Sequence, residues 1–326
     1  MEIHNKVKSF RTVLWISIVI TYLLILVGAA VRATGSGMGC PDWPKCFGQY
    51  IPPTDVSQLP ANYKEVFKVE GKEIADFNAF HTWVEYLNRL LGVVEGFAIL
   101  GLLIAAIRIR KEHKKLWIGS VFTFILVLII GWVGSKVVSS NLAPAKITLH
   151  MILALVMSFM LVGMLFLLHA KNEGKKSRVD KKIFYFFIAY FILTLLQIIM
   201  GTQVRQQIDV IAIQLQNTHR EVWIENLDEV FTFHKLMALL LLSSFIAAYY
   251  LWRKKIDTKL RGLFRIALVV LFLELIIGDI LNRMMPAALQ PFHLFIANVF
   301  IGLVFYILMH INIRLWVKDE EIQEKK

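Results

Sequence analysis

Charge is scarce in this chain of 326 residues. Asp, Glu, Lys and Arg make up 18% of the sequence and hydrophobic residues 57%, whereas an average soluble domain is about 25% charged and about 45–50% apolar. The mean hydropathy is +0.61. This composition excludes an ordinary soluble enzyme and a disordered chain. Proline and cysteine are also rare, with eight and two residues, which excludes a collagen-like or disulfide-stapled scaffold.

Long apolar runs fill most of the sequence. They cover 13–31, 84–107, 116–138, 147–169, 183–204, 231–252, 262–282 and 290–316. Each is close to the roughly 20 residues that a helix needs to cross a bilayer, and the first is too long for the core of a signal peptide. A backbone in lipid must satisfy its own hydrogen bonds, which favours helices. The sequence therefore predicts an all-α integral membrane protein with eight transmembrane helices.

Basic residues gather in alternate connections between these runs. They precede the first run and recur at 108–115, 171–182 and 253–261, whereas the connection 206–230 is mainly acidic. The positive-inside rule then places both termini in the cytoplasm, as an even number of spans requires. This topology accounts for the net charge of +12, so we expect no nucleic-acid partner. We expect the protein to lie in a bacterial-type plasma (inner) membrane, with membrane lipid around it.

The two halves of the chain carry matching motifs in the same order. These are Gly28-Ala-Ala-Val-Arg32 and Gly201-Thr-Gln-Val-Arg205, then Ile129-Ile-Gly131 and Ile276-Ile-Gly278. Both halves enter from the same side, which indicates a parallel repeat. We expect two tandem, pseudo-symmetric four-helix bundles. The first is 1–170, with an extended outer loop at 32–83, and the second is 171–326.

Three histidines lie near the starts of even-numbered predicted helices, at one depth toward the outer face. They are His150, His234 and His293. Ionisable residues in a membrane are costly and usually functional. A neutral imidazole bonded to a neighbouring helix is the alternative. The pair in the second bundle, His234 and His293, suits an iron porphyrin held by two imidazoles.

Three cations lie near the same level: Arg205, Lys235 and Arg283. They are candidates to pair with the propionates of such a porphyrin. The alternative is that their side chains reach the membrane interface.

A polar stripe follows the second predicted helix. Its members, spaced to share one helix face, are His81, Glu85, Asn88, Gly92 and Glu95. Buried carboxylates need a partner or a raised pKa, and a structural ion pair of Glu85 with Arg32 or Arg89 is one alternative. The other is a site in the first bundle, lined by Glu85, Asn88 and His150.

Both cysteines lie in the first outer loop, as Gly-Cys40-Pro-Asp-Trp-Pro-Lys-Cys46. Two cysteines without nearby histidines do not make a four-ligand zinc site. An oxidising exterior favours a disulfide between Cys40 and Cys46. A redox role through thiol exchange remains as an alternative.

The segment from Gly28 to Gly48, including Trp43-Pro-Lys-Cys46, resembles the haem A synthase family. The histidines that open the even-numbered predicted helices extend this resemblance over nearly the whole chain. It implies oxidation of the C8 methyl of haem O to the formyl group of haem A, for a terminal cytochrome oxidase. It also implies a haem b cofactor on His234 and His293, and substrate haem in the first bundle.

The chain departs from the family at Asn88. The family pattern Glu-x-x-His-Arg reads here Glu85-Tyr-Leu-Asn88-Arg89. Either His150 holds the substrate iron alone and leaves one iron position open, or His81 takes part. We favour the open site, with Glu85 as proton donor or acceptor.

The resemblance also implies partners: haem O synthase as the source of the substrate, the oxidase that receives the product, and an unidentified electron-transfer partner. Two other functions fit the same composition. One is a b-type cytochrome that carries electrons, and the other is a non-catalytic haem delivery or assembly factor. Neither needs the polar stripe of the second predicted helix.

Overall fold

The computed structural model describes residues 2–170, 180–215, 218–219 and 222–311, and among these no β-strand occurs. The long helices are α1 (Glu2–Ala33), α3 (Ala79–Ile107), α4 (Lys114–Ser139), α5 (Pro144–Ala170), α6 (Lys181–Gln214), α7 (Glu229–Trp252), α8 (Thr258–Met284) and α9 (Gln290–Ile311). Each predicted apolar run lies in one of these helices. The end of the last run, 312–316, and most of the basic connection 171–182 lie outside the described residues.

Seven of these helices are long and apolar enough to cross a membrane. The chain is accordingly a multi-pass integral membrane protein. The exception is α8, which has 27 residues and carries Arg265, Glu274 and Asp279 in its interior. These charges lower its mean hydropathy below that of the other seven, so an eighth span is not shown by composition.

One predicted boundary differs from the structure. The connection 206–230 was expected after the fifth run, but α6 continues without a break to Gln214. The added turns are apolar on one face, where Ile208 and Ile211 are buried with Trp223. That local cluster stabilises the helix beyond the length that a membrane requires.

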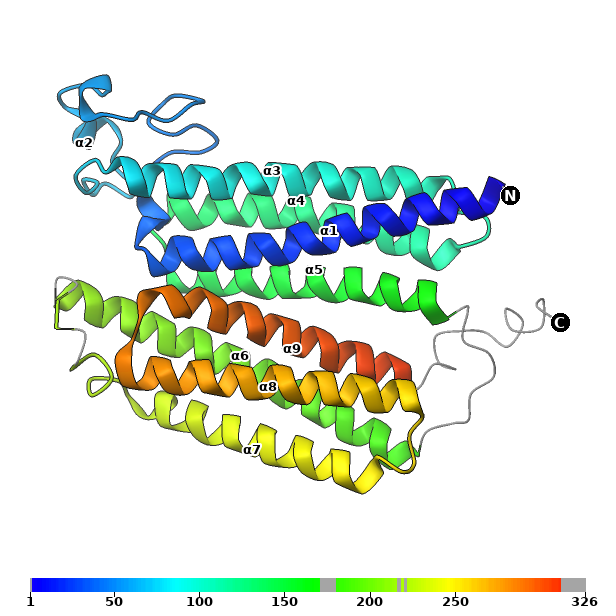
Figure 1. The fold of residues 1–326 in the computed structure, drawn as a ribbon. Coiled ribbons are helices and arrows are strands. Elements are labelled where there is room, and N and C mark those ends of the chain that lie inside the picture. Colours follow the sequence, from blue (N-terminus) through cyan, green and yellow to red (C-terminus); the bar gives the residue numbers. More distant parts are fainter. Residues whose placement is uncertain (1, 171–179, 216–217, 220–221, 312–326) are drawn as a thin grey trace. The chain divides into compact units, whose positions relative to one another are not determined.

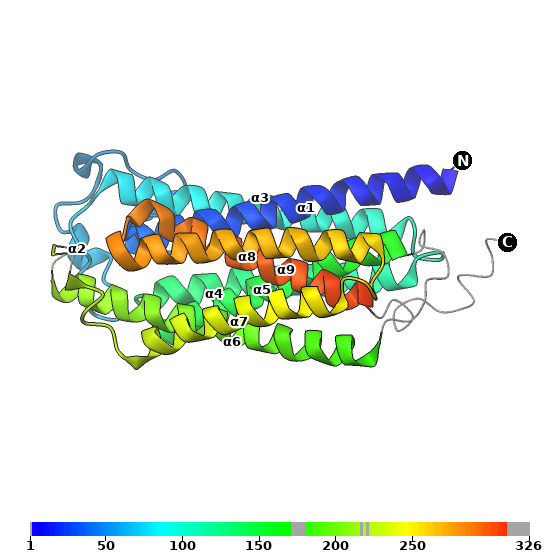
Figure 2. The same ribbon diagram turned by 60° about the horizontal axis from the view of Figure 1, so that its bottom comes forward.

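The chain divides into two compact units, Met1–Leu161 and Val162–Lys326. In the first unit α3 packs against both α1 and α4, as the blue, cyan and green helices of Figures 1 and 2 show. In the second unit α6 contacts α7, α7 contacts α8, α8 contacts α9, and α9 returns to α6. These four helices therefore close into a bundle.

An aromatic core fills one end of the second bundle. It contains Phe187, Tyr190, Phe245 and Phe264, which are almost fully buried. The Tyr190 hydroxyl donates a hydrogen bond to the carbonyl of Leu241 at 3.1 Å, so its polar atom is satisfied. The candidate histidines lie near the other ends of these helices. The aromatic core therefore does not fill the end of the bundle that holds the histidines.

The first connection folds on itself beside the start of α3. It contains two 3₁₀ turns and the short helix α2 (Tyr63–Val66). Its core consists of Cys40, Cys46, Phe47, Leu59 and Tyr63. Edge-to-face contacts between aromatic rings, such as Phe47 and Phe67 at 5.4 Å between centroids, make this loop a packed structure.

Candidate functional site

Two histidine rings meet inside the second unit. His234 lies in the second turn of α7 and His293 in the first turn of α9, and their ring centroids are 6.5 Å apart. The ring planes are inclined by 79°. The Nδ1 atoms of both rings are buried, which leaves Nε2 as the nitrogen available for a ligand.

Glycines on the facing helices make room for these rings. A Cβ at Gly201 of α6 would lie 3.2 Å from Cε1 of His234, and one at Gly278 of α8 would lie 3.3 Å from Cε1 of His293. Both distances are shorter than ordinary van der Waals contacts. Any larger residue in place of Gly201 or Gly278 would therefore displace an imidazole.

The first unit repeats this arrangement with one change. Gly134 of α4 faces Cε1 of His150, where a Cβ would lie 3.3 Å away, and Gly28 of α1 faces the amide of Asn88, where it would lie 3.7 Å from Oδ1. Asn88 thus has the same kind of glycine neighbour as the three histidines. The Nδ1 of His150 and the Oδ1 of Asn88 are both buried without a hydrogen bond.

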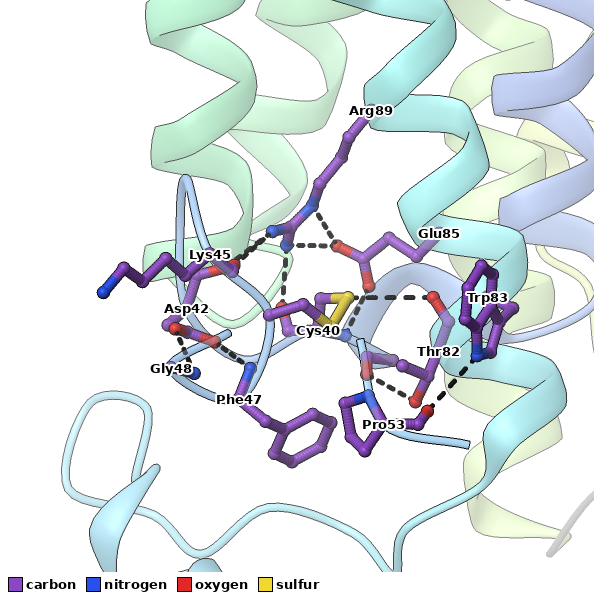
Figure 3. Close-up of a disulfide and its surroundings, with 12 residues drawn as sticks. Cys40, Asp42, Lys45, Phe47, Gly48, Pro53, Thr82, Trp83, Glu85 and Arg89 are labelled. Atoms are coloured by element: carbon purple, nitrogen blue, oxygen red, sulfur yellow. Dashed lines mark hydrogen bonds and ion pairs between the residues drawn. A yellow bond between two sulfur atoms is a disulfide. The ribbon is translucent and has the colours of Figure 1, made fainter. Parts of the chain in front are cut away.

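The carboxylate of Glu85 joins α3 to the first connection (Figure 3). Its Oε2 accepts a hydrogen bond from the backbone N–H of Cys40 at 2.9 Å. Its Oε1 accepts from Nε and Nη2 of Arg89, at 3.1 and 2.6 Å. The side chains are 5% and 14% exposed, so this is a buried ion pair. It is the pairing with Arg89 that the sequence left open as an alternative.

Arg89 also holds the loop directly. Its Nη1 donates to the carbonyls of Asp42 and Lys45, at 2.6 and 3.0 Å, and its Nη2 donates to the carbonyl of Cys40 at 2.8 Å. Figure 3 shows the guanidinium between α3 and these carbonyls. The planar guanidinium offers five N–H donors in a fixed arrangement, whereas a lysine ammonium offers three.

Cys40 and Cys46 are joined by a disulfide next to this network. The carboxylate of Asp42 accepts hydrogen bonds from the N–H groups of Phe47 and Gly48, at 2.6 and 2.9 Å. These bonds link the inside of the disulfide ring to the two residues that follow Cys46. Gly39 lies so close to α3 that a Cβ would be 2.3 Å from the carbonyl oxygen of His81. A glycine is therefore required where the loop meets the helix.

The other predicted site residues have partners of their own. Arg205 pairs with Asp209 at 2.7 Å and also donates to the Gln290 side chain. The ammonium of Lys235 lies 4.3 Å from the ring centre of Phe231.

Two further predicted residues have local partners. Arg283 forms an exposed ion pair with Asp279 at 2.9 Å. His81 lies at the first turn of α3, where its Nδ1 is 2.9 Å from the hydroxyl of Ser36. The structure thus engages His81 with the first connection.

Sequence reasoning missed a carboxylate beside the histidine pair. Glu274 of α8 places Oε1 at 3.0 Å from Nδ1 of His293. The feature that could have revealed it is an acidic residue in the middle of an apolar run. Buried Glu95 was noticed as part of the stripe, but its partner was not: it accepts a hydrogen bond from the Thr21 hydroxyl at 2.5 Å.

Residues 11–305 match the model of the COX15-CtaA family, described as cytochrome oxidase assembly protein. The chain belongs to this family. The match covers both units, so the histidines, Asn88 and the disulfide loop all lie within it.

Several curated proteins named "Heme A synthase" are similar to the chain. The protein of Exiguobacterium sp. is 24% identical over 317 residues, which is 94% of both chains. Those of Shewanella oneidensis and Bartonella bacilliformis are 29% and 30% identical over 161 and 149 residues. These two alignments span 49% and 43% of this chain and 45% and 41% of the relatives, so each covers less than half of the relative's length.

The distance between the two imidazole rings of the second unit matches the spacing that a bis-imidazole haem needs. Metal–imidazole bonds of about 2 Å on both sides of an iron place the two ring centres roughly 6–6.5 Å apart, and here they are 6.5 Å apart. Histidine imidazoles are common axial ligands of haem iron in proteins. His234 and His293 therefore fit an axial ligand pair.

Proposed function

We propose that this protein is a haem A synthase, a membrane oxidoreductase that converts the C8 methyl of haem O into the formyl group of haem A. The proposal rests on two side chains in each unit that each lie against a glycine of a neighbouring helix. The chain that carries them belongs to this family. One set has two histidines and the other has His150 and Asn88, which supports two haem sites with different roles.

In the proposed cofactor site, His234 and His293 hold haem b. A haem with two imidazole ligands supplies one-electron transfer. The residues' own task is to fix the ring orientations and exclude water, and the glycine contacts at Gly201 and Gly278 support that task. Arg205 and Lys235 remain candidates for the propionates, because Arg205 lies one turn after Gly201 on α6 and Lys235 directly follows His234 on α7.

In the proposed substrate site, haem O is held from one side by His150. On the opposite side of the haem we place Asn88, whose side chain is a neutral amide. Its Oδ1 is buried and makes no hydrogen bond within the described part of the chain. A methyl-to-formyl conversion is a four-electron oxidation that adds one oxygen, so protons must leave the site. Glu85 lies one turn from Asn88 on α3 and is the candidate to accept them, with Arg89 holding its carboxylate.

The orientation in the membrane is part of this proposal. We infer eight spans in two tandem pseudo-symmetric bundles, both termini in the cytoplasm, and the haem sites toward the outer face of a bacterial-type plasma membrane. Packing of α8 against both α7 and α9 supports its inclusion as a span. The proposed partners are haem O synthase upstream, the terminal oxidase downstream, and an electron-transfer partner.

Site-directed variants test the assignment of the two sites. His234→Ala and His293→Ala should each abolish the bis-imidazole low-spin spectrum of haem b. His150→Ala should leave that spectrum in place and abolish conversion of haem O. Glu85→Gln should retain bound haem and slow turnover, because it removes a titrating proton at constant shape. An unchanged low-spin spectrum in both second-unit variants would contradict the ligand assignment.

A further inference from the structure

The residue four positions before each site glycine lies beside the ring that the glycine faces. In an α-helix, positions i and i+4 share one face. The imidazoles of His150, His234 and His293 approach the backbone of Ile130, Gln197 and Glu274, which precede Gly134, Gly201 and Gly278 by one turn. The same register in the first half places Leu24 before Gly28.

The side chains at this position differ between the two units. They are apolar in the first unit, Leu24 and Ile130, and polar in the second, Gln197 and Glu274. Gln197 uses its amide nitrogen to donate to the backbone carbonyl of His234 at 3.0 Å, so it holds the helix and not the ring. Only Glu274 of these four residues carries a carboxylate, and it faces the ring of its histidine.

The contact between Glu274 and His293 is close and shielded. Oε1 lies 3.0 Å from Nδ1, and the two side chains are 13% and 30% exposed. Nδ1 of His293 and Oε2 of Glu274 are both buried, and neither makes a regular hydrogen bond within the described part of the chain. A carboxyl at membrane depth is unfavourable, and it weakens α8 as a span, so leucine or isoleucine would suit helix insertion better.

On the basis of the proposed function, we propose that Glu274 is a positioning residue for haem b. It accepts a hydrogen bond from Nδ1 of His293, fixes the ring plane, and leaves Nε2 as the iron-binding atom. A carboxylate acceptor on the second nitrogen also makes an imidazole a stronger electron donor to the metal. The two proposed haem sites thereby differ, because the residue at the same position of the first unit is Ile130, whose side chain has no acceptor.

The experiment uses the full-length protein purified with its haem. Glu274→Leu places at this position the kind of side chain that the first unit has, and it removes the acceptor. Glu274→Gln keeps an oxygen of the same reach. Asp279→Asn is the matched control, because it lies on the same helix in an exposed ion pair with Arg283. The readouts are haem b per protein, the electron paramagnetic resonance spectrum of the ferric haem, and its midpoint potential.

Glu274→Leu should retain haem b but shift the largest g value, because the ring of His293 is no longer held. It should also raise the midpoint potential, because a weaker donor favours ferric iron less. Glu274→Gln should shift both in the same direction by a smaller amount, and Asp279→Asn should match the wild type. A g value and potential in Glu274→Leu equal to those of the wild type would overturn the proposal.

Two further outcomes keep this test separate from the proposed function. If Glu274→Leu does not accumulate in the membrane, Glu274→Gln decides, and an unchanged potential in that variant overturns the positioning role. A wild-type protein without low-spin haem b, or His293→Ala with an unchanged spectrum, would instead contradict the haem b site itself.

Discussion

Removal of the Arg89 guanidinium should release the first connection from α3. Arg89 donates five hydrogen bonds: two to the Glu85 carboxylate and one each to the carbonyls of Asp42, Lys45 and Cys40. In Arg89→Leu the carboxylate stays buried without its counter-charge, and three carbonyls lose their donor. Loss of one partner from a buried ion pair typically costs about 3–5 kcal/mol. The population of the open loop should therefore rise roughly 100- to 4,000-fold.

The matched control is another carboxylate–arginine pair with the same spacing, at an exposed site. Arg283 pairs with Asp279 across four residues of α8, but their side chains are 72% and 55% exposed. Exposed pairs contribute about 0–1 kcal/mol, so Arg283→Leu should have little effect. Arg89→Lys should be intermediate, because an ammonium keeps the charge but cannot reach the carboxylate and all three carbonyls.

Limited proteolysis in proteoliposomes measures this opening. Chymotrypsin added to the outer side can cleave at exposed Tyr50 at any time, so the readout is cleavage at Phe47 or Tyr63, which are buried while the loop is docked. Cleavage that is slow relative to closing reports the open population. A cleavage rate in Arg89→Leu within twofold of the wild-type rate would refute the view that this ion pair holds the loop on α3.

Two substitutions and one labelling experiment also test the first unit. Gly39→Ala should undock the loop as strongly as Arg89→Leu, because its Cβ would lie 2.3 Å from the carbonyl oxygen of His81; normal protease resistance would contradict this. Thiol labelling of Cys40 and Cys46 should require prior reduction, and labelling of both in untreated membranes would exclude the disulfide. Asn88→His should convert the substrate haem to a six-coordinate, low-spin form and slow turnover, as measured by optical spectra and haem O conversion; faster turnover would contradict the open site.

Helix positions were predictable from the sequence because the membrane imposes a simple requirement. A run of about 20 apolar residues must form a helix in lipid, and the eight predicted runs lie in α1 and α3–α9. The end of α6 at Gln214 was not predictable in this way. It depends on contacts of Ile208 and Ile211 with Trp223, which lies beyond the helix.

The network around Arg89 shows the limit of sequence reasoning about the site. The sequence places Glu85 and Arg89 one turn apart, so their ion pair could be anticipated. The carbonyls that Arg89 also binds belong to residues 40–45, more than 40 positions earlier in the chain. No periodic pattern encodes that contact, because it depends on how the loop folds.

The same limit applies to Glu274. Histidines near the starts of α7 and α9 could be recognised as candidates, since each is an ionisable residue in an apolar run. Whether Glu274 reaches His293 depends on the rotation of α8 about its axis, which packing in the bundle decides. Gly278 is the local feature of α8 that is consistent with this rotation, because it permits the close approach of the His293 ring.

Extraction of the haems from cells tests the central claim most directly. The host should make haem O but lack its own haem A synthase, and it should express this chain. The account predicts that haem A appears and haem O falls, that His150→Ala at equal protein level restores haem O alone, and that haem b remains bound in that variant. Haem b in the purified protein without any haem A in the cells would contradict the account, and would instead indicate an electron carrier or a haem delivery factor.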